Sequence, residues 1–363
     1  MYWIVAIAVA GPFFVSLVVT RVVRGWARRT GFVDVPSGHK RHNAPVALGG
    51  GIALVISICG PILLGTVAAW AVQRYGDRTW VPDLLKVHLD GIVSRLPVVA
   101  AIVGGALVLH VVGLIDDRRP LGPWSKLVVQ IVVALFTAWP VGIRALEVLP
   151  SPLSIVLTVF WIVLVTNAFN FLDNMDGLSA GVAVIAATIF SLASMNAGQI
   201  FVPAMTFVVV GALLGFLWFN FSPATIFMGD AGSLVVGYLM GVLTVLTTFY
   251  DPGRNLTPLG VIVPLVVLAV PLYDVTSVVI HRLRAGESPF RGDWRHFSHR
   301  LVKRGMTPRG AVLTIYLATA ATALPAIVLA KVDWLTAALL LLQCLCVVAM
   351  IAILEHTGVA EGK

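Results

Sequence analysis

Carboxylate and carboxamide side chains are concentrated in four short segments of a chain that is otherwise largely apolar. These segments are GLIDDRRPLGPWSK (113–126), NAFNFLDNMDGLSAG (167–181), FMGDAGS (227–233) and GDWRHFSHR (292–300). Asp and Asn oxygens are hard ligands that suit Mg²⁺ or Mn²⁺. The three cysteines all lie in apolar stretches, so the pattern favours an oxygen-bound divalent cation over a zinc site or a disulfide framework.

The spacing within two of these segments narrows the chemistry. Asp116 and Asp117 are adjacent. Like charges at a membrane surface usually need a cation or a functional role, and a structural helix cap is the alternative. Asn170, Asp173 and Asp176 are three residues apart, so they would share one stripe if a helix continued through them.

The remaining features of these segments suit phosphate groups. The glycines of FMGDAGS let the backbone approach a ligand closely, and a helix opening at Gly232-Ser233 would offer its first amides to an anion. Arg118, Arg119 and Lys126 stand near the aspartate pair as cationic partners. A metal held by carboxylates, with cations nearby at the level of the lipid headgroups, predicts phosphoryl transfer to or from a lipid.

The elements that must position these residues are membrane-spanning helices. Hydrophobic residues make up 59% of the 363 and charged residues 12%, against roughly 45–50% and about 25% in soluble proteins. At roughly 20 residues per span, we expect an all-α integral membrane protein, a single multi-span domain over residues 1–363 with about eleven helices. The expected spans are 2–22, 46–72, 96–115, 126–143, 153–169, 178–196, 201–219, 232–249, 258–281, 310–330 and 334–354.

The basic residues predict which ends of these spans face the cytoplasm. Of the 25 Lys and Arg residues, 18 fall with one set of connections and 7 with the other. Cytoplasmic loops are enriched in Lys and Arg, so the N-terminus should lie outside and the C-terminus in the cytoplasm. The net charge of +8 therefore reflects topology and not nucleic-acid binding. The basic set contains all four acidic segments and comprises loops 23–45, 116–125, 170–177, 220–231 and 282–309 with the C-terminal tail.

Taken together, the segments resemble the polyprenyl-phosphate N-acetylhexosamine-1-phosphate transferases of glycosyltransferase family 4, which include WecA-type and MraY-type enzymes. The resemblance covers nearly the whole chain. Its motifs are Asp34-Val35-Pro36 with Lys40, His42 and Gly49-Gly50; Asp116-Asp117 with Lys126; Asn167 and Asn170 through Asp173 and Asp176; Phe227 through Ser233; and Ser288-Pro289-Phe290 with Asp293, His296 and His299.

The resemblance implies a reaction in which an N-acetylhexosamine 1-phosphate passes from a UDP-sugar to polyprenyl (undecaprenyl) phosphate, with release of UMP and a need for Mg²⁺, or Mn²⁺ in its place. It implies a bacterial inner-membrane enzyme with its active site on the cytoplasmic face, acting at the first membrane step of cell-envelope polysaccharides such as lipopolysaccharide, O-antigen or teichoic acid. The partners are the UDP-sugar, the polyprenyl phosphate and the bilayer. The resemblance is compatible with a homodimer and does not decide the oligomeric state.

The same resemblance implies a role for each matching residue. Asp230 is the expected ligand of the metal. The expected catalytic residues are Asp116, Asp117, Asp173 and Asp176. The expected substrate-binding residues are Lys40, His42, Lys126, Asn167, Asn170, Asp293, His296 and His299. For His296 and His299, the alternative is a pair of plain interfacial histidines.

Two positions depart from the family pattern. Asn174 stands where glycine commonly follows the first aspartate, and Ser298 stands where the histidine motif commonly has its middle histidine. The histidine spacing, the Ser-Pro-Phe lead-in and the eleven spans are closer to the WecA-type branch, so GlcNAc 1-phosphate is favoured over the MurNAc-pentapeptide phosphate of the other branch. A secondary transporter is a distant alternative, which should carry its carboxylates near the bilayer midplane and show an internal repeat.

Overall fold

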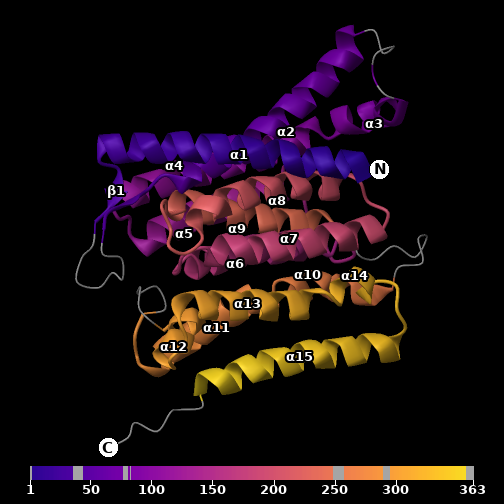
Figure 1. The fold of residues 1–363 in the computed structure, drawn as a ribbon. Coiled ribbons are helices and arrows are strands. Elements are labelled where there is room, and N and C mark those ends of the chain that lie inside the picture. The colour runs from indigo at the N-terminus through magenta and orange to yellow at the C-terminus, as the bar shows by residue number, and fades with distance from the viewer. Residues whose placement is uncertain are drawn as a thin grey trace, which may run out of the picture.

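The computed structural model describes residues 2–35, 44–76, 81, 83–247, 257–288 and 295–356. Long helices run side by side in one bundle (Figure 1). In that view α1 begins at one end of the bundle, and α15 ends at the other, near α12. Lys40, His42 and Asp293, three of the expected substrate-binding residues, lie outside the described residues.

The first half of the chain contributes helices and one small two-stranded antiparallel sheet, in which Val33 pairs with Ala47. Its elements are α1 (Tyr2–Thr30), β1 (Val33–Asp34), β2 (Val46–Ala47), α2 (Gly50–Tyr75), α3 (Asp83–Ser94), α4 (Leu96–Arg118), α5 (Pro123–Ala138), α6 (Ser151–Leu172) and α7 (Leu178–Asn196).

In the second half of the chain, the regular elements that the structure describes are all helices. These are α8 (Phe201–Asn220), α9 (Asp230–Leu246), the 3₁₀ turn η3 (Pro258–Ile262), α10 (Val263–Val267), α11 (Ala269–Arg284), α12 (Phe297–Lys303), α13 (Pro308–Ala323), α14 (Ala326–Leu329) and α15 (Trp334–His356).

The lengths of these helices agree with a protein that crosses a membrane many times. Within the described residues, eight helices are long and apolar enough to span a bilayer. The segment Pro258–Val267 with α11, bent by 64°, makes a ninth span if the pair is counted as one. Two further expected spans, 126–143 and 232–249, correspond to the shorter apolar helices α5 and α9, which have 16 and 17 residues. The structure therefore confirms an all-α polytopic membrane protein.

Helix α9 occupies the interior of the bundle, where it packs against α2, α4 and α6 (Figure 1). Nearly all of its side chains are buried, as expected for a helix that is apolar on every side. The backbones come closest at its first turn. A Cβ added to Gly51 of α2 or to Gly113 of α4 would lie 2.4 Å from backbone atoms of Ala231. Glycine at these two positions therefore lets the backbones of α2 and α4 pack directly against the first turn of α9.

Candidate active site at the start of the buried helix

The turn that leads into α9 is held by backbone contacts with distant parts of the chain. Phe227 N–H donates to the carbonyl of Ala47 in β2 at 2.9 Å, and Gly50 N–H donates to the Phe227 carbonyl at 3.0 Å. Gly229 then adopts a positive φ of 68°. A Cβ at Gly229 would lie 2.5 Å from Oδ2 of Asp117, so both the conformation and the close approach require glycine.

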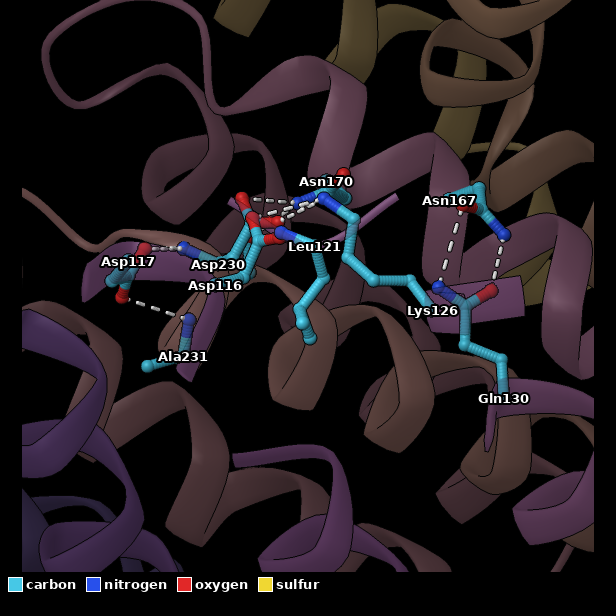
Figure 2. Close-up of polar contacts among 10 residues, drawn as sticks. Asp116, Asp117, Leu121, Lys126, Gln130, Asn167, Asn170, Asp230 and Ala231 are labelled. Carbon is cyan, nitrogen blue, oxygen red and sulfur yellow. Dashed lines mark hydrogen bonds and ion pairs between the residues drawn. The ribbon is translucent and has the colours of Figure 1, made fainter. Parts of the chain in front are cut away.

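The carboxylate of Asp117 accepts hydrogen bonds from the first backbone amides of α9. Its Oδ1 accepts the backbone N–H of Asp230 at 2.8 Å, and its Oδ2 accepts that of Ala231 at 3.2 Å (Figure 2). A negative group at a helix N-terminus satisfies unpaired donors and complements the helix dipole. The first amides of this helix therefore bind a side chain of the protein itself, not the free anion that the sequence led us to expect. His110 supports the same turn, because its Nδ1 donates to the Ala231 carbonyl at 2.9 Å.

Lys126 joins two of the acidic segments. Its Nζ lies 3.0 Å from Oδ2 of Asp116 and 2.7 Å from Oδ2 of Asp230, residues that are 114 positions apart (Figure 2). Asp116 is oriented by the backbone N–H of Leu121, which donates to its Oδ1 at 2.6 Å. The side chains of Lys126, Asp116 and Asp230 retain 23%, 14% and 25% of their exposure. The ion pairs are therefore open to a ligand.

Two asparagines of α6 complete this arrangement from a third segment. Asn170 Nδ2 donates to Oδ1 of Asp230 at 3.0 Å and to Oγ of Ser233 at 2.9 Å. Asn167 lies one turn deeper, where its Nδ2 donates to Oε1 of Gln130 at 2.5 Å (Figure 2). Gln130, at 3% exposure, was missed by sequence reasoning because a lone Gln in an apolar helix gives no signal before its partner is known. We call Asp116, Asp117, Lys126, Asn170 and Asp230 the acidic cluster.

The expected stripe of Asn170, Asp173 and Asp176 does not form. Helix α6 ends at Leu172, and the following turn closes with Gly177 at a φ of 74°. Asp and Asn residues favour turns over helix interiors, which explains the early end. Asp176 points to another loop and accepts the backbone N–H of Ala224 at 2.9 Å.

Asp173 remains electrostatically close to the acidic cluster although it is not on the expected stripe. Burial, with the negative charges of Asp230 and Asp117 added to it, raises the pKa of the Asp173 carboxyl to about 8. The site therefore gathers more carboxyl groups than Lys126 alone balances, so that Asp173 retains a proton, and a further cation could take the place of that proton.

The two histidines are buried, and their segment contacts the end of α6 and the turn that follows it. His296 has 7% exposure and His299 has 6%. Nδ1 of His296 donates to Oδ2 of Asp274 at 2.9 Å, and the imidazole meets the ring of Phe171 edge-on with centroids 5.8 Å apart. Asp274, 1% exposed, is a second residue that sequence reasoning missed, because it lies inside an expected span.

The acidic cluster fits a divalent cation by its donor chemistry. Within the described residues, no group of three or more His, Cys, Asp or Glu side chains has an arrangement that could hold a metal ion. The carboxylates of Asp116 and Asp230 nevertheless converge on one cationic atom, Nζ of Lys126. Hard carboxylate oxygens in such an arrangement suit Mg²⁺, provided that the ammonium moves aside.

Comparison with known proteins gives consistent matches. Residues 99–248 match the family model for glycosyl transferase family 4. The chain is 30% identical to the probable undecaprenyl-phosphate N-acetylglucosaminyl 1-phosphate transferase of Bacillus subtilis, over 98% of this chain and 94% of that protein. It is 33% identical to the decaprenyl-phosphate N-acetylglucosaminephosphotransferase of Mycolicibacterium smegmatis, over 83% and 77%. It is 27% identical to the undecaprenyl-phosphate alpha-N-acetylglucosaminyl 1-phosphate transferase of Escherichia coli K12, over 81% and 75%.

Proposed function

We infer the function from the fact that this chain belongs to glycosyl transferase family 4, in the branch of the polyprenyl-phosphate N-acetylglucosaminyl 1-phosphate transferases. It transfers N-acetylglucosamine 1-phosphate to a polyprenyl phosphate. We propose that the donor is UDP-GlcNAc, that UMP is released, and that the product is a polyprenyl diphosphate-sugar that begins a cell-envelope polysaccharide.

One observation carries this proposal: the similarity to an enzyme whose name states this transfer extends over 98% of the chain. The fold supports it by bringing Asp116, Asn170 and Asp230 from three separate segments onto connected contacts through Lys126 and direct hydrogen bonds. A phosphoryl transferase needs such convergence, because its catalysis rests mainly on positioning and on neutralising phosphate charge.

We propose that Asp230 holds Mg²⁺, with Asp116 close enough to share it. When bound, the metal would neutralise negative charge on the diphosphate of the donor. Lys126, once released from its two carboxylates, would bind a phosphate oxygen. Asn170 orients the Asp230 carboxylate, and Asp117 keeps the backbone of the α9 start in place for it. Asp173 and Asp176 would shape the same site from the turn after α6.

We also propose direct displacement, in which an oxygen of the polyprenyl phosphate attacks the sugar-linked phosphorus and UMP leaves. The alternative is a phosphorylated aspartate. Both carboxylate oxygens of Asp117 accept backbone hydrogen bonds, and both oxygens of Asp116 have partners as well. The two contacts with the α9 backbone disfavour Asp117 as a nucleophile, and Asp116, whose Oδ2 becomes free when Lys126 moves, is assigned to the metal instead. Exchange of labelled UMP into UDP-GlcNAc in the absence of lipid acceptor would contradict direct displacement.

For the membrane, we propose that α5, α9 and the bent pair also cross, which gives eleven spans with the N-terminus outside. The distribution of 18 against 7 basic residues supports a site on the cytoplasmic face, and the bacterial relatives support the inner membrane of a bacterium as its location. Single cysteines placed next to Asp117 and Asp230 should react with an impermeant thiol reagent only from the cytoplasmic side. Labelling of the two positions from opposite sides would contradict the shared site.

The function is tested by UMP release from a panel of UDP-sugars. Purified protein is given undecaprenyl phosphate, Mg²⁺ and either UDP-GlcNAc, another UDP-amino sugar or the UDP-MurNAc-pentapeptide. We expect UDP-GlcNAc to give the highest kcat/KM. Preference for the peptide-bearing donor would favour the other branch of the superfamily, and no release from any donor would contradict the transferase.

A further inference from the structure

A single amide connects the turn after α6 to the segment that carries the histidines. The Ser298 hydroxyl donates to Oδ1 of Asn174 at 2.5 Å, although the two residues are 124 positions apart. Ser298 is 2% exposed, so its hydroxyl is shielded from water on its own side, and the contact as a whole is partly buried. Asn174 is fixed at its other end, because its Nδ2 donates to the Phe171 carbonyl at 2.7 Å. Its carboxamide therefore spans two elements, with both of its polar atoms in use.

The two partners are also the two positions at which this chain departs from the pattern of its family. Asn174 replaces a common glycine, and Ser298 replaces the common middle histidine. Glycine at 174 would have no side chain to reach Ser298, and an imidazole at 298 would occupy more space than the hydroxyl does. The contact therefore gives the two departures one physical explanation: each side chain fits the other.

The position of the pair relates it to both histidines. Ser298 lies between His296 and His299, whose ring centroids are 6.3 Å apart. Phe171, whose carbonyl receives the Asn174 amide, packs edge-on against His296. Asn174 itself follows Asp173, the carboxyl with the raised pKa near the acidic cluster. A displacement at either residue would thus shift the imidazoles relative to the acidic cluster.

We propose that Asn174 and Ser298 are a matched pair of positioning residues, which hold the histidine segment (295–303) against the turn after α6 so that its imidazoles meet the donor nucleotide-sugar. This inference rests on the proposed function for its ligand. Neither residue contacts the reacting atoms in this assignment.

The test is a double-mutant cycle with UDP-GlcNAc as the varied substrate. We expect Asn174→Ala and Ser298→Ala each to lower kcat/KM about fivefold, the size of one neutral hydrogen bond, mainly by raising KM. The double variant should be no worse than either single variant, because both remove the same contact. Losses that simply multiply, or an unchanged KM, would overturn the pair.

Exchange towards the family pattern sharpens the test. We expect Ser298→His alone to lower kcat/KM further than Ser298→Ala, and the combination N174G/S298H to recover most of that loss. No recovery would contradict mutual compensation. Thr137→Val is the matched control, because it removes a buried 2.9 Å hydrogen bond to Tyr238 inside the bundle. It should lower the melting temperature and leave KM within about twofold.

Thermal unfolding separates this inference from the proposed function. The melting temperatures of the alanine variants should show the same non-additivity, with no substrate present. If the wild-type protein released no UMP, the proposed function would fail, and the melting temperatures would still decide whether the contact exists. Additive melting temperatures would overturn the contact whatever the activity.

Discussion

The acidic cluster and the histidine segment (295–303) both meet the end of α6, through Asn170 and Phe171, but they are built in different ways. The cluster is held by ion pairs whose side chains remain 14–25% exposed. The histidine segment is held by carboxylates that are almost fully enclosed. Asp274, with a side chain 1% exposed, accepts both Nδ1 of His296 and the backbone N–H of Phe297.

A second enclosed carboxylate extends this difference to the C-terminal helix. Glu355 of α15, with a side chain 1% exposed, pairs with Arg300 at 2.9 Å and accepts the Tyr273 hydroxyl at 2.5 Å. Ion pairs that keep some contact with solvent exchange more readily with a ligand than fully buried ones, which are costly to break. The comparison indicates that the acidic cluster is the part that must rearrange around ligands, and that the histidine segment is fixed in advance.

The largest effect is expected from Asp230→Asn, which removes a negative charge from the acidic cluster and retains the shape of the side chain. We expect a fall in kcat on the order of 10³-fold, because an amide binds a divalent cation far more weakly than a carboxylate does. UMP release at saturating Mg²⁺ measures it. Retained turnover would remove Asp230 from the metal role.

Asp333→Asn is the matched control for that variant. Asp333 also lies at the start of a helix, where its carboxylate accepts the backbone N–H groups of Leu335 and Thr336. It directly precedes α15, which begins at Trp334, and its printed side-chain contacts are all with the first turn of that helix. Its turnover should stay within about twofold of the wild type. A large loss here would mean that any carboxylate at a helix start disturbs the fold.

The contrast also explains what the sequence could predict. The residues Asp116, Lys126, Asn170 and Asp230, which meet in the structure, are charged or amide groups next to span ends, where such groups are rare and conspicuous. Asp274 and Glu355 could not be found in the same way. Asp274 is a lone acid inside an expected span, Glu355 directly follows the last one, and each acquires a role only from a tertiary partner.

The sequence likewise predicted the helices of the fold better than their ends. Apolar runs predicted the long helices and the loop at 170–177, and the structure agrees, since α6 ends at Leu172 and α7 begins at Leu178. The stripe through Asp173 and Asp176 depended on the helix continuing into residues that favour turns, and it does not form. The lengths of α5 and α9 could not be inferred from apolar content either. Helix α9 is enclosed by protein, so it needs no particular length to match the bilayer, and its hydrophobic run does not fix its ends. Helix α5 exposes apolar side chains such as Val128, Val132 and Phe136, so this explanation does not extend to it.

The raised pKa of Asp173 allows a test of metal binding at the acidic cluster that needs no mutation. Below about pH 8 this carboxyl holds a proton in the metal-free folded protein. A divalent cation competes with that proton, so the affinity for Mg²⁺ should rise as the pH increases towards 8, by up to about tenfold per unit for one displaced proton. Titration of the melting temperature with Mg²⁺ at pH 6, 7 and 8 measures it.

The raised pKa of Asp173 also determines whether the stability of the metal-free protein rises or falls with pH. An unfolded Asp loses its proton near pH 4, whereas folded Asp173 keeps its proton until about pH 8. The free energy of unfolding of the metal-free protein should therefore fall between these values as the pH rises. Saturating Mg²⁺ should remove much of that fall. A pH-independent Mg²⁺ affinity would contradict the shift, and Asp173→Asn, which cannot titrate, is the control.

A smaller effect is expected from Asp274→Asn in the histidine segment. The variant can still accept the Phe297 N–H but presents an amide donor to His296, which must then turn or change tautomer. We expect kcat/KM to fall about fivefold. In a His296→Ala background the same change should have little further effect, because Asp274 acts through that ring. Equal losses in both backgrounds would mean that Asp274 is only structural.

The smallest effect on turnover should come from Glu355→Gln, although it disturbs a buried ion pair. Gln retains an acceptor for the Tyr273 hydroxyl but leaves Arg300 without its counter-charge. The expected cost in unfolding free energy is about 1–3 kcal/mol, read as a lower melting temperature. Turnover at low temperature should stay within about twofold, because this contact fixes the histidine segment from the side away from Asn174. If turnover fell tenfold with an unchanged melting temperature, α15 would contribute to the chemistry, and the distinction between a mobile cluster and a fixed support would fail.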